Sequence, residues 1–182
     1  MATASDSDVA PERARRVVQR LIDEQVAKRS DIFFMNTKHY DVRELGQKAA
    51  DAFGDQKSQM NALEQTALNA STFGDIIDYV KSQLGRTTQA GDDWRSNDFG
   101  YDLHEELVAV GDQADGHAEN LLESLSEGVC RALQKQGEST GEFEKRLRQE
   151  LARRLRVRYA QAYIGHVVAH YNYVISRDLA TV

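Results

Sequence analysis

Two histidines near the C-terminal end, His166 and His170, lie four residues apart in the sequence HVVAH. On a helix this spacing places both imidazoles on one face, where they could bind one metal ion. The zinc-protease motif has a glutamate directly after the first histidine, and Val167 stands there instead. Carboxylate-bridged di-iron bundles need Glu-x-x-His pairs, and neither histidine has one. We therefore expect a hydrogen-bonded histidine pair with no metal and no cofactor. The open alternative is a third ligand from His39, His104 or His117.

The same two histidines belong to a longer series of basic and aromatic residues. Its members recur every three or four residues: Arg156, Tyr159, Tyr163, His166, His170 and Tyr173. Such a stripe can hold nucleic acid, since arginine suits phosphates and aromatic rings stack on unpaired bases. Three further cations, Lys145, Arg146 and Arg153, point away from the first apolar face of the same predicted helix. The alternative is that the aromatic stripe packs against neighbouring helices, because tyrosine and histidine often fill such interfaces.

This basic-aromatic region supplies the predicted nucleic-acid-binding residues. They are Lys145, Arg146, Arg153, Arg156, Tyr159, Tyr163, His166 and His170. The sequence lacks the phosphate-binding loop, the dinucleotide-binding glycine motif and the serine nucleophile motif. The single cysteine, Cys130, is expected to be a buried and inert thiol. We therefore expect a protein that is not an enzyme.

Charge is divided unevenly along the chain, although the net charge is only −6. Residues 87–128 carry eleven acidic residues and one arginine, a local charge of −10, whereas residues 142–160 carry a local charge of +4. One interpretation is that the acidic and basic helices pack together and pair their flanks. Another is that the excess arginines bind phosphates. Both interpretations hold if some of the arginines pair with acidic residues of the protein and the others bind phosphates.

Helical periodicity predicts the helices that carry these residues. Apolar residues at three- and four-residue intervals predict helices over about 11–29 and 42–53, then over about 60–70 and 73–84. Capping signals support three helix starts: Asp41 with Glu44, Thr72 with Asp75, and Ser139 with Glu142. Gly54 favours the left-handed backbone that ends a helix. Residues 31–40 form either a loop or an extension of a neighbouring helix.

Two long helices follow in the second half of the chain. An acidic one is expected from Tyr101 to about Ala132, bent or split at its glycines, and a basic-aromatic one runs from about Ser139 to Arg177. The apolar face of the last helix turns by more than a right angle along its length. That turn requires either a kink near Gly165 or burial on different sides by different helices. Residues 86–100 are predicted to be the longest loop.

Fold class follows from these patterns. The sequence shows no convincing strand periodicity, so we predict an all-α bundle of about five to six helices. Residues 11–182 are expected to form a single domain after a flexible tail at 1–10. The longest apolar runs have four residues, too few to cross a membrane. The start of the sequence is small and acidic, unlike a signal peptide, so we expect a cytoplasmic protein.

Two segments carry a resemblance to a known family. Residues 58–63, with the sequence SQMNAL, resemble an S-Q-[LIM]-R-x-[LF] element in the small helical subunit of type III CRISPR effector complexes. Residues 163–173, with the sequence YIGHVVAHYNY, are similar to that family's closing helix. The chain departs from the pattern at Asn61, where the family has arginine. The resemblance covers about one fifth of the chain. It implies a non-catalytic subunit of an effector that touches guide or target nucleic acid.

Two functional hypotheses follow. The leading one is a non-enzymatic helical subunit of a larger assembly, which binds RNA or single-stranded DNA through its last helix. Its partners would be nucleic acid and other protein subunits. The alternative is a structural or protein-interaction bundle that self-associates into a homo-oligomer and does not bind nucleic acid.

Overall fold

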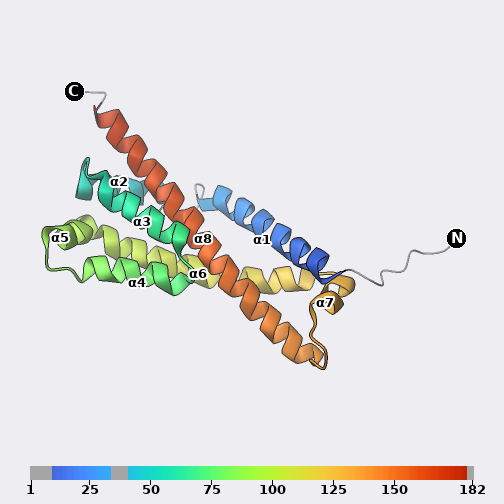
Figure 1. Cartoon of the computed structure of the whole chain (residues 1–182). Coiled ribbons are helices and arrows are strands. Elements are labelled where there is room, and N and C mark those ends of the chain that lie inside the picture. Colours follow the sequence, from blue (N-terminus) through green and yellow to red (C-terminus); the bar gives the residue numbers. More distant parts are fainter. Residues whose placement is uncertain (1–9, 34–40, 180–182) are drawn as a thin grey trace.

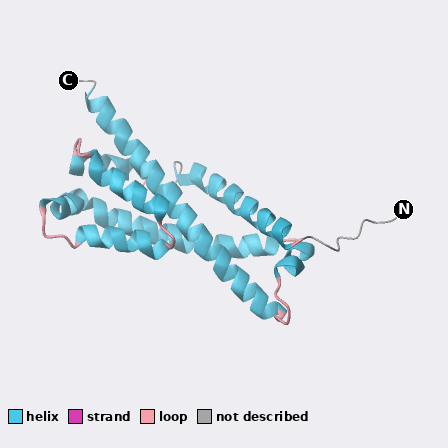
Figure 2. Ribbon diagram, in the orientation of Figure 1, coloured by secondary structure: helices cyan, strands magenta, loops and turns pink. Residues whose placement is uncertain are grey.

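All the regular structure that this chain forms in its described part is helical (Figures 1 and 2). The computed structural model describes residues 10–33 and 41–179. Within these ranges there are eight α-helices and one 3-10 helix, in the order α1 (Pro11–Phe33), α2 (Val42–Phe53), α3 (Lys57–Asn69), α4 (Phe73–Leu84), α5 (Gln89–Arg95), η1 (Ser96–Asp98), α6 (Phe99–Ser124), α7 (Glu127–Leu133) and α8 (Thr140–Leu179). The all-α prediction is confirmed, with more helices than the predicted five to six.

The last helix, α8, is the centre of the bundle. It runs as one helix of 40 residues across Gly165, and it crosses the whole molecule diagonally in Figure 1. Helices α6 and α2 pack against it most extensively, and α1, α3 and α4 cover further parts of its surface. The apolar face of α8 therefore turns because different helices bury it on different sides, and not because of a kink near Gly165.

Predicted capping residues start several of these helices. The Asp41 side chain accepts a hydrogen bond from the Arg43 N–H at the start of α2. Thr72 and Asp75 form a reciprocal capping box at the start of α4. The same exchange joins Ser139 to Glu142 at the start of α8. Such bonds satisfy the free N–H groups of a first helical turn, which explains why these short local signals predict helix starts so well.

The predicted loop over residues 86–100 is wrong from residue 89 onward. Helix α5, the 3-10 helix and the start of α6 occupy residues 89–100, and Trp94 on α5 is fully buried. The Trp94 ring packs edge-on against Phe53 and close to Phe99, and its indole N–H donates to Gln59 Oε1 at 3.2 Å. Burial of this one large side chain turns a polar, glycine-containing stretch into a folded part of the bundle.

Three further boundaries differ from or refine the sequence prediction. Helix α1 continues past Arg29 to Phe33, so part of the undecided segment 31–40 extends it. The remaining residues of that segment, 34–40, lie outside the described residues, as do residues 1–9 of the predicted tail. The long acidic helix is split, because α6 ends at Ser124 and α7 starts at Glu127 with the Ser126 side chain as its cap.

Helices α2 and α8 approach each other very closely at Gly46. A Cβ atom built on Gly46 would lie 2.8 Å from His170 Cβ and 3.0 Å from the backbone nitrogen of Tyr171. No side chain larger than hydrogen fits there unless one helix moves. Gly46 therefore sets the distance between these two helices. None of the described helices is long and apolar enough to cross a membrane.

Candidate nucleic-acid interface

Arg156, a predicted phosphate contact, is bound to the acidic helix. Its Nε donates to Asp115 Oδ1 at 2.9 Å and its Nη2 donates to Asp115 Oδ2 at 2.5 Å. This two-point ion pair joins α8 to α6. A guanidinium that is already paired in this way has little charge left for a phosphate. We therefore exclude Arg156 from the interface proposed below.

Arg146 is also held by a carboxylate, although it faces a hollow in the surface. Its Nε and Nη2 donate to the two oxygens of Glu138 at 2.7 and 3.0 Å, and Nη2 also donates to the Leu133 carbonyl oxygen at 3.1 Å. The guanidinium additionally lies 5.5 Å from the centre of the Phe143 ring. The hydrogen bonds from Arg146 lower the pKa of Glu138 to about 2. This cluster fixes the connection between α7 and α8.

The two predicted stacking tyrosines, Tyr159 and Tyr163, are both 0% exposed. The Tyr159 hydroxyl lies 2.7 Å from His117 Nδ1 on α6, and the two rings meet edge to face. Burial raises the pKa of both tyrosines. Neither ring has a face open to a base, so the packing interpretation of the aromatic stripe applies to these two residues. We remove both from the proposed interface.

The two histidines of the HVVAH sequence contact different helices. His166 Nε2 lies 2.5 Å from Ser30 Oγ on α1, whereas His170 packs beside Gly46 on α2. Burial lowers the pKa of His170. In the described part of the chain, no three side chains of the metal-binding types come together as a candidate site. The pair therefore holds α8 to two neighbours, and we place neither histidine in the interface.

The remaining predicted cations, Lys145 and Arg153, are exposed on α8. Arg153 lines a hollow of about 350 Å³ between α1 and α8, and this hollow continues into a larger one of about 580 Å³. Gln19 and Arg154 line both hollows. We call the combined surface the α1–α8 groove. Lys145 is not among the residues that line it.

The α1–α8 groove is strongly basic in a protein of net negative charge. Among the described residues, seven basic and two acidic side chains line it, together with an apolar floor that includes Val18, Leu133 and Leu147. The basic residues are Arg15, Arg16, Lys135, Arg146, Arg153, Arg154 and Arg158, and the acidic ones are Asp23 and Glu150. Concave surfaces lined by one sign of charge concentrate ligands of the opposite sign.

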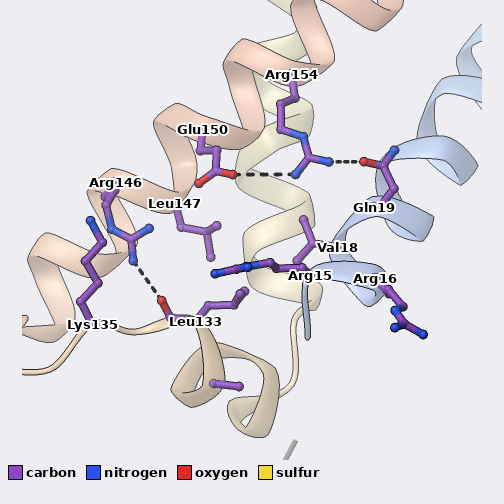
Figure 3. Close-up of a pocket in the computed structure, with 11 residues that line it drawn as sticks. Arg15, Arg16, Val18, Gln19, Leu133, Lys135, Arg146, Leu147, Glu150 and Arg154 are labelled. Carbon is purple, nitrogen blue, oxygen red and sulfur yellow. Dashed lines mark hydrogen bonds and ion pairs between the residues drawn. The ribbon is translucent and has the colours of Figure 1, made fainter. Parts of the chain in front are cut away.

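Not all of these cations are equally available. Arg154 donates to Gln19 across the groove and lies 3.8 Å from Glu150, as Figure 3 shows. Arg158 pairs with Asp23 at 3.4 Å. By contrast, Arg15, Lys135 and Arg153 form no ion pair with any described residue. Arg15 projects from α1 into the space beside Leu133 (Figure 3). These three cations are the ones an incoming anion would meet unpaired.

Most of the groove was missed by the sequence prediction. Of the eight predicted residues, only Arg146 and Arg153 line it. The contribution of α1 was missed because its lining arginines, Arg15 and Arg16, lie 130 residues or more from the arginines of α8 in the chain. A usable signal was present, since residues 11–20 hold four arginines and one acidic residue, namely Arg13, Arg15, Arg16, Arg20 and Glu12.

A second large hollow has the opposite character. It measures about 760 Å³ and is lined by the end of α6, by α7 and by the first turns of α8. Four glutamates line it, with two arginines that each pair with one of them: Arg131 with Glu127 and Arg148 with Glu119. Burial, Glu144 and Glu127 raise the pKa of Cys130 in this hollow. The charge segregation of the sequence therefore survives folding as two surfaces that share the first half of α8.

Comparison with protein-family models, with curated proteins and with solved structures found no match to this chain. The resemblance of residues 58–63 and 163–173 to the type III CRISPR small subunit stays a prediction. In the structure, Gln59 of the first segment accepts the Trp94 hydrogen bond. Much of the second segment is packed within the bundle as part of α8. Both segments therefore have structural roles.

Proposed function

We propose that this protein is a non-enzymatic helical subunit that binds RNA or single-stranded DNA in the α1–α8 groove. The observation that carries the proposal is a set of three cations that form no ion pair with any described residue. Arg15 on α1 and Lys135 in the α7–α8 connection line the larger hollow of the groove, and Arg153 on α8 lines the smaller one. Arginine and lysine bind phosphates directly, and such contacts dominate affinity for nucleic acid.

The setting we propose is a larger assembly in the cytoplasm. The groove is the surface we assign to nucleic acid. The acidic hollow, lined by the end of α6, by α7 and by the first turns of α8, is a second surface, which we assign to protein subunits. A small subunit of a type III CRISPR effector, which two segments of the sequence resemble, would have this division of surfaces. Binding in the groove does not depend on this resemblance.

The test compares two variants of equal net charge. In the groove variant, Arg15→Gln, Lys135→Gln and Arg153→Gln are combined. In the control variant, Lys57→Gln, Lys81→Gln and Arg86→Gln remove three exposed cations that do not line the groove. We expect the groove variant to bind a fluorescent single-stranded RNA at least tenfold more weakly than the wild-type protein, and the control variant to stay within about threefold.

Equal weakening of both variants would mean that binding depends on net charge alone, and the proposal would be wrong. Failure of the wild-type protein to bind at low salt would favour the alternative of a self-associating structural bundle. Sedimentation of the same samples then measures that alternative directly, because a homo-oligomer has a defined mass.

A further inference from the structure

The lining of the α1–α8 groove contains charge and apolar surface but almost no neutral hydrogen-bonding groups. Gln19 and Ser71 are the two uncharged polar side chains that line it in the part of the chain the structure describes. The Gln19 amide is already engaged on both sides, since it donates to Asp23 at 2.9 Å and accepts from Arg154. Bases are distinguished through hydrogen bonds to their edges, often from asparagine and glutamine. The groove has little with which to make that distinction.

No aromatic side chain lines the described part of the groove either. The two tyrosines that could have supplied stacking surfaces from α8, Tyr159 and Tyr163, lie in the core. Val18, Leu133 and Leu147 offer an apolar floor that accepts the flat face of any base equally. The polar contacts to a bound strand are therefore made to its phosphates, which carry no sequence information.

The dimensions of the groove favour one strand over two. Arg146 and Arg158 mark its two ends on α8, and twelve residues of helix span about 18 Å. That length matches about five nucleotides of a stacked strand, which rise about 3.4 Å each along the strand axis, and fewer nucleotides of an extended strand. Proteins that read a duplex insert a helix or a ribbon into its major groove. Here the cations instead line a hollow between two helices, a concave site suited to one strand.

From these observations we infer that the α1–α8 groove binds one unpaired strand through its phosphates, without selecting for base sequence and without distinguishing RNA from DNA. This inference rests on the proposed function and specifies its ligand. Arg15, Lys135 and Arg153 hold successive phosphates, and the bases lie over the apolar floor or point to solvent.

The experiment measures binding of the full chain to fluorescent 12-nucleotide probes by anisotropy at low salt. The probes are oligo-rU, oligo-rC, oligo-dT, alternating r(GU) and a 12-base-pair RNA duplex. We expect the four single strands to bind within about threefold of one another and the duplex to bind at least tenfold more weakly. The groove variant lacking Arg15, Lys135 and Arg153 should weaken binding of all four single strands by a similar factor.

Two results would overturn the inference while leaving the proposed function intact. One is a preference of tenfold or more for one single strand, including a guanine preference through the arginines. The other is duplex binding as tight as single-strand binding. In both, the groove variant would still reduce affinity. If no probe binds the wild-type protein, or if the groove variant binds every probe normally, the proposed function fails and the inference fails with it.

Discussion

Arg156 on α8 and Asp115 on α6 form a two-point ion pair, with donor–acceptor distances of 2.9 and 2.5 Å. This pair joins the most basic helix of the chain to the most acidic one. The neighbouring Arg153 lies three residues earlier on the same helix, yet it lines the α1–α8 groove and has no ion-pair partner among the described residues. Sequence position alone does not separate these two arginines, but their contacts do.

The first prediction follows from that difference. Arg153→Gln should reduce affinity for single-stranded RNA by about threefold to tenfold, because it removes one unpaired phosphate contact. Arg156→Gln removes the same charge from the same helix, and its affinity should stay within about twofold of wild type. Fluorescence anisotropy of both variants at one low salt concentration measures this. Equal losses would mean that the Arg156–Asp115 pair opens to bind phosphate.

A second prediction concerns the buried tyrosine that the sequence placed in the interface. Tyr159→Phe removes the hydroxyl next to His117 Nδ1, so the free energy of unfolding should fall by about 1 kcal/mol. Tyr173→Phe, at a residue that is 58% exposed, is the matched control and should change it by less than about 0.5 kcal/mol. Urea denaturation measures both. An unchanged stability in Tyr159→Phe, together with weaker RNA binding, would return this residue to the interface.

Acid should destabilise the bundle through His117. Burial, with Arg29 nearby, lowers the pKa of His117 below its ordinary value of 6.5. The unfolded chain therefore binds the proton more readily, and stability falls as the pH drops through about 6.5 and below. The urea midpoint should decrease between pH 7.5 and 5, and less so in His117→Gln. Some decrease should persist in that variant, because burial also lowers the pKa of His170. A midpoint that rises over this range would contradict the account.

The close approach of α2 to α8 gives a fourth prediction. Gly46→Ala places a Cβ atom against His170 and the backbone of Tyr171, so it should destabilise the protein by about 1–3 kcal/mol. Gly116→Ala is the matched control, because a Cβ atom there meets nothing within 4 Å. That variant should gain up to about 1 kcal/mol from the better helix propensity of alanine. Thermal unfolding measures both variants: the melting temperature should fall for Gly46→Ala and rise for Gly116→Ala.

Local features of this fold were predictable from the sequence, and non-local ones were not. Thr72 with Asp75 and Ser139 with Glu142 act within one helical turn, so their spacing alone predicts the helix starts. The polar neighbours of Trp94 predict a loop. What orders that segment is packing against Phe53 and Phe99 from other parts of the chain.

In the candidate site, too, the local features were predictable from the sequence and the non-local ones were not. The excess of arginine on the last helix was visible in the sequence and two of those arginines, Arg146 and Arg153, do line the groove. The sequence could not show that α1 supplies the opposite wall, because that depends on how two helices at the two ends of the chain pack together. Nor could it separate paired arginines from unpaired ones, since Asp115 and Glu138 lie on other elements.

The salt dependence of binding measures how many phosphates the α1–α8 groove contacts. Each phosphate contact on a single strand contributes about −0.7 to the slope of log K against log salt concentration. With three to four such contacts in the groove, the wild-type protein should show a slope of about −2 to −3 with oligo-rU. Combining Arg15→Gln, Lys135→Gln and Arg153→Gln should bring that slope about 2 closer to zero. A slope that the groove variant leaves unchanged, or no binding by the wild-type protein at low salt, would contradict the account.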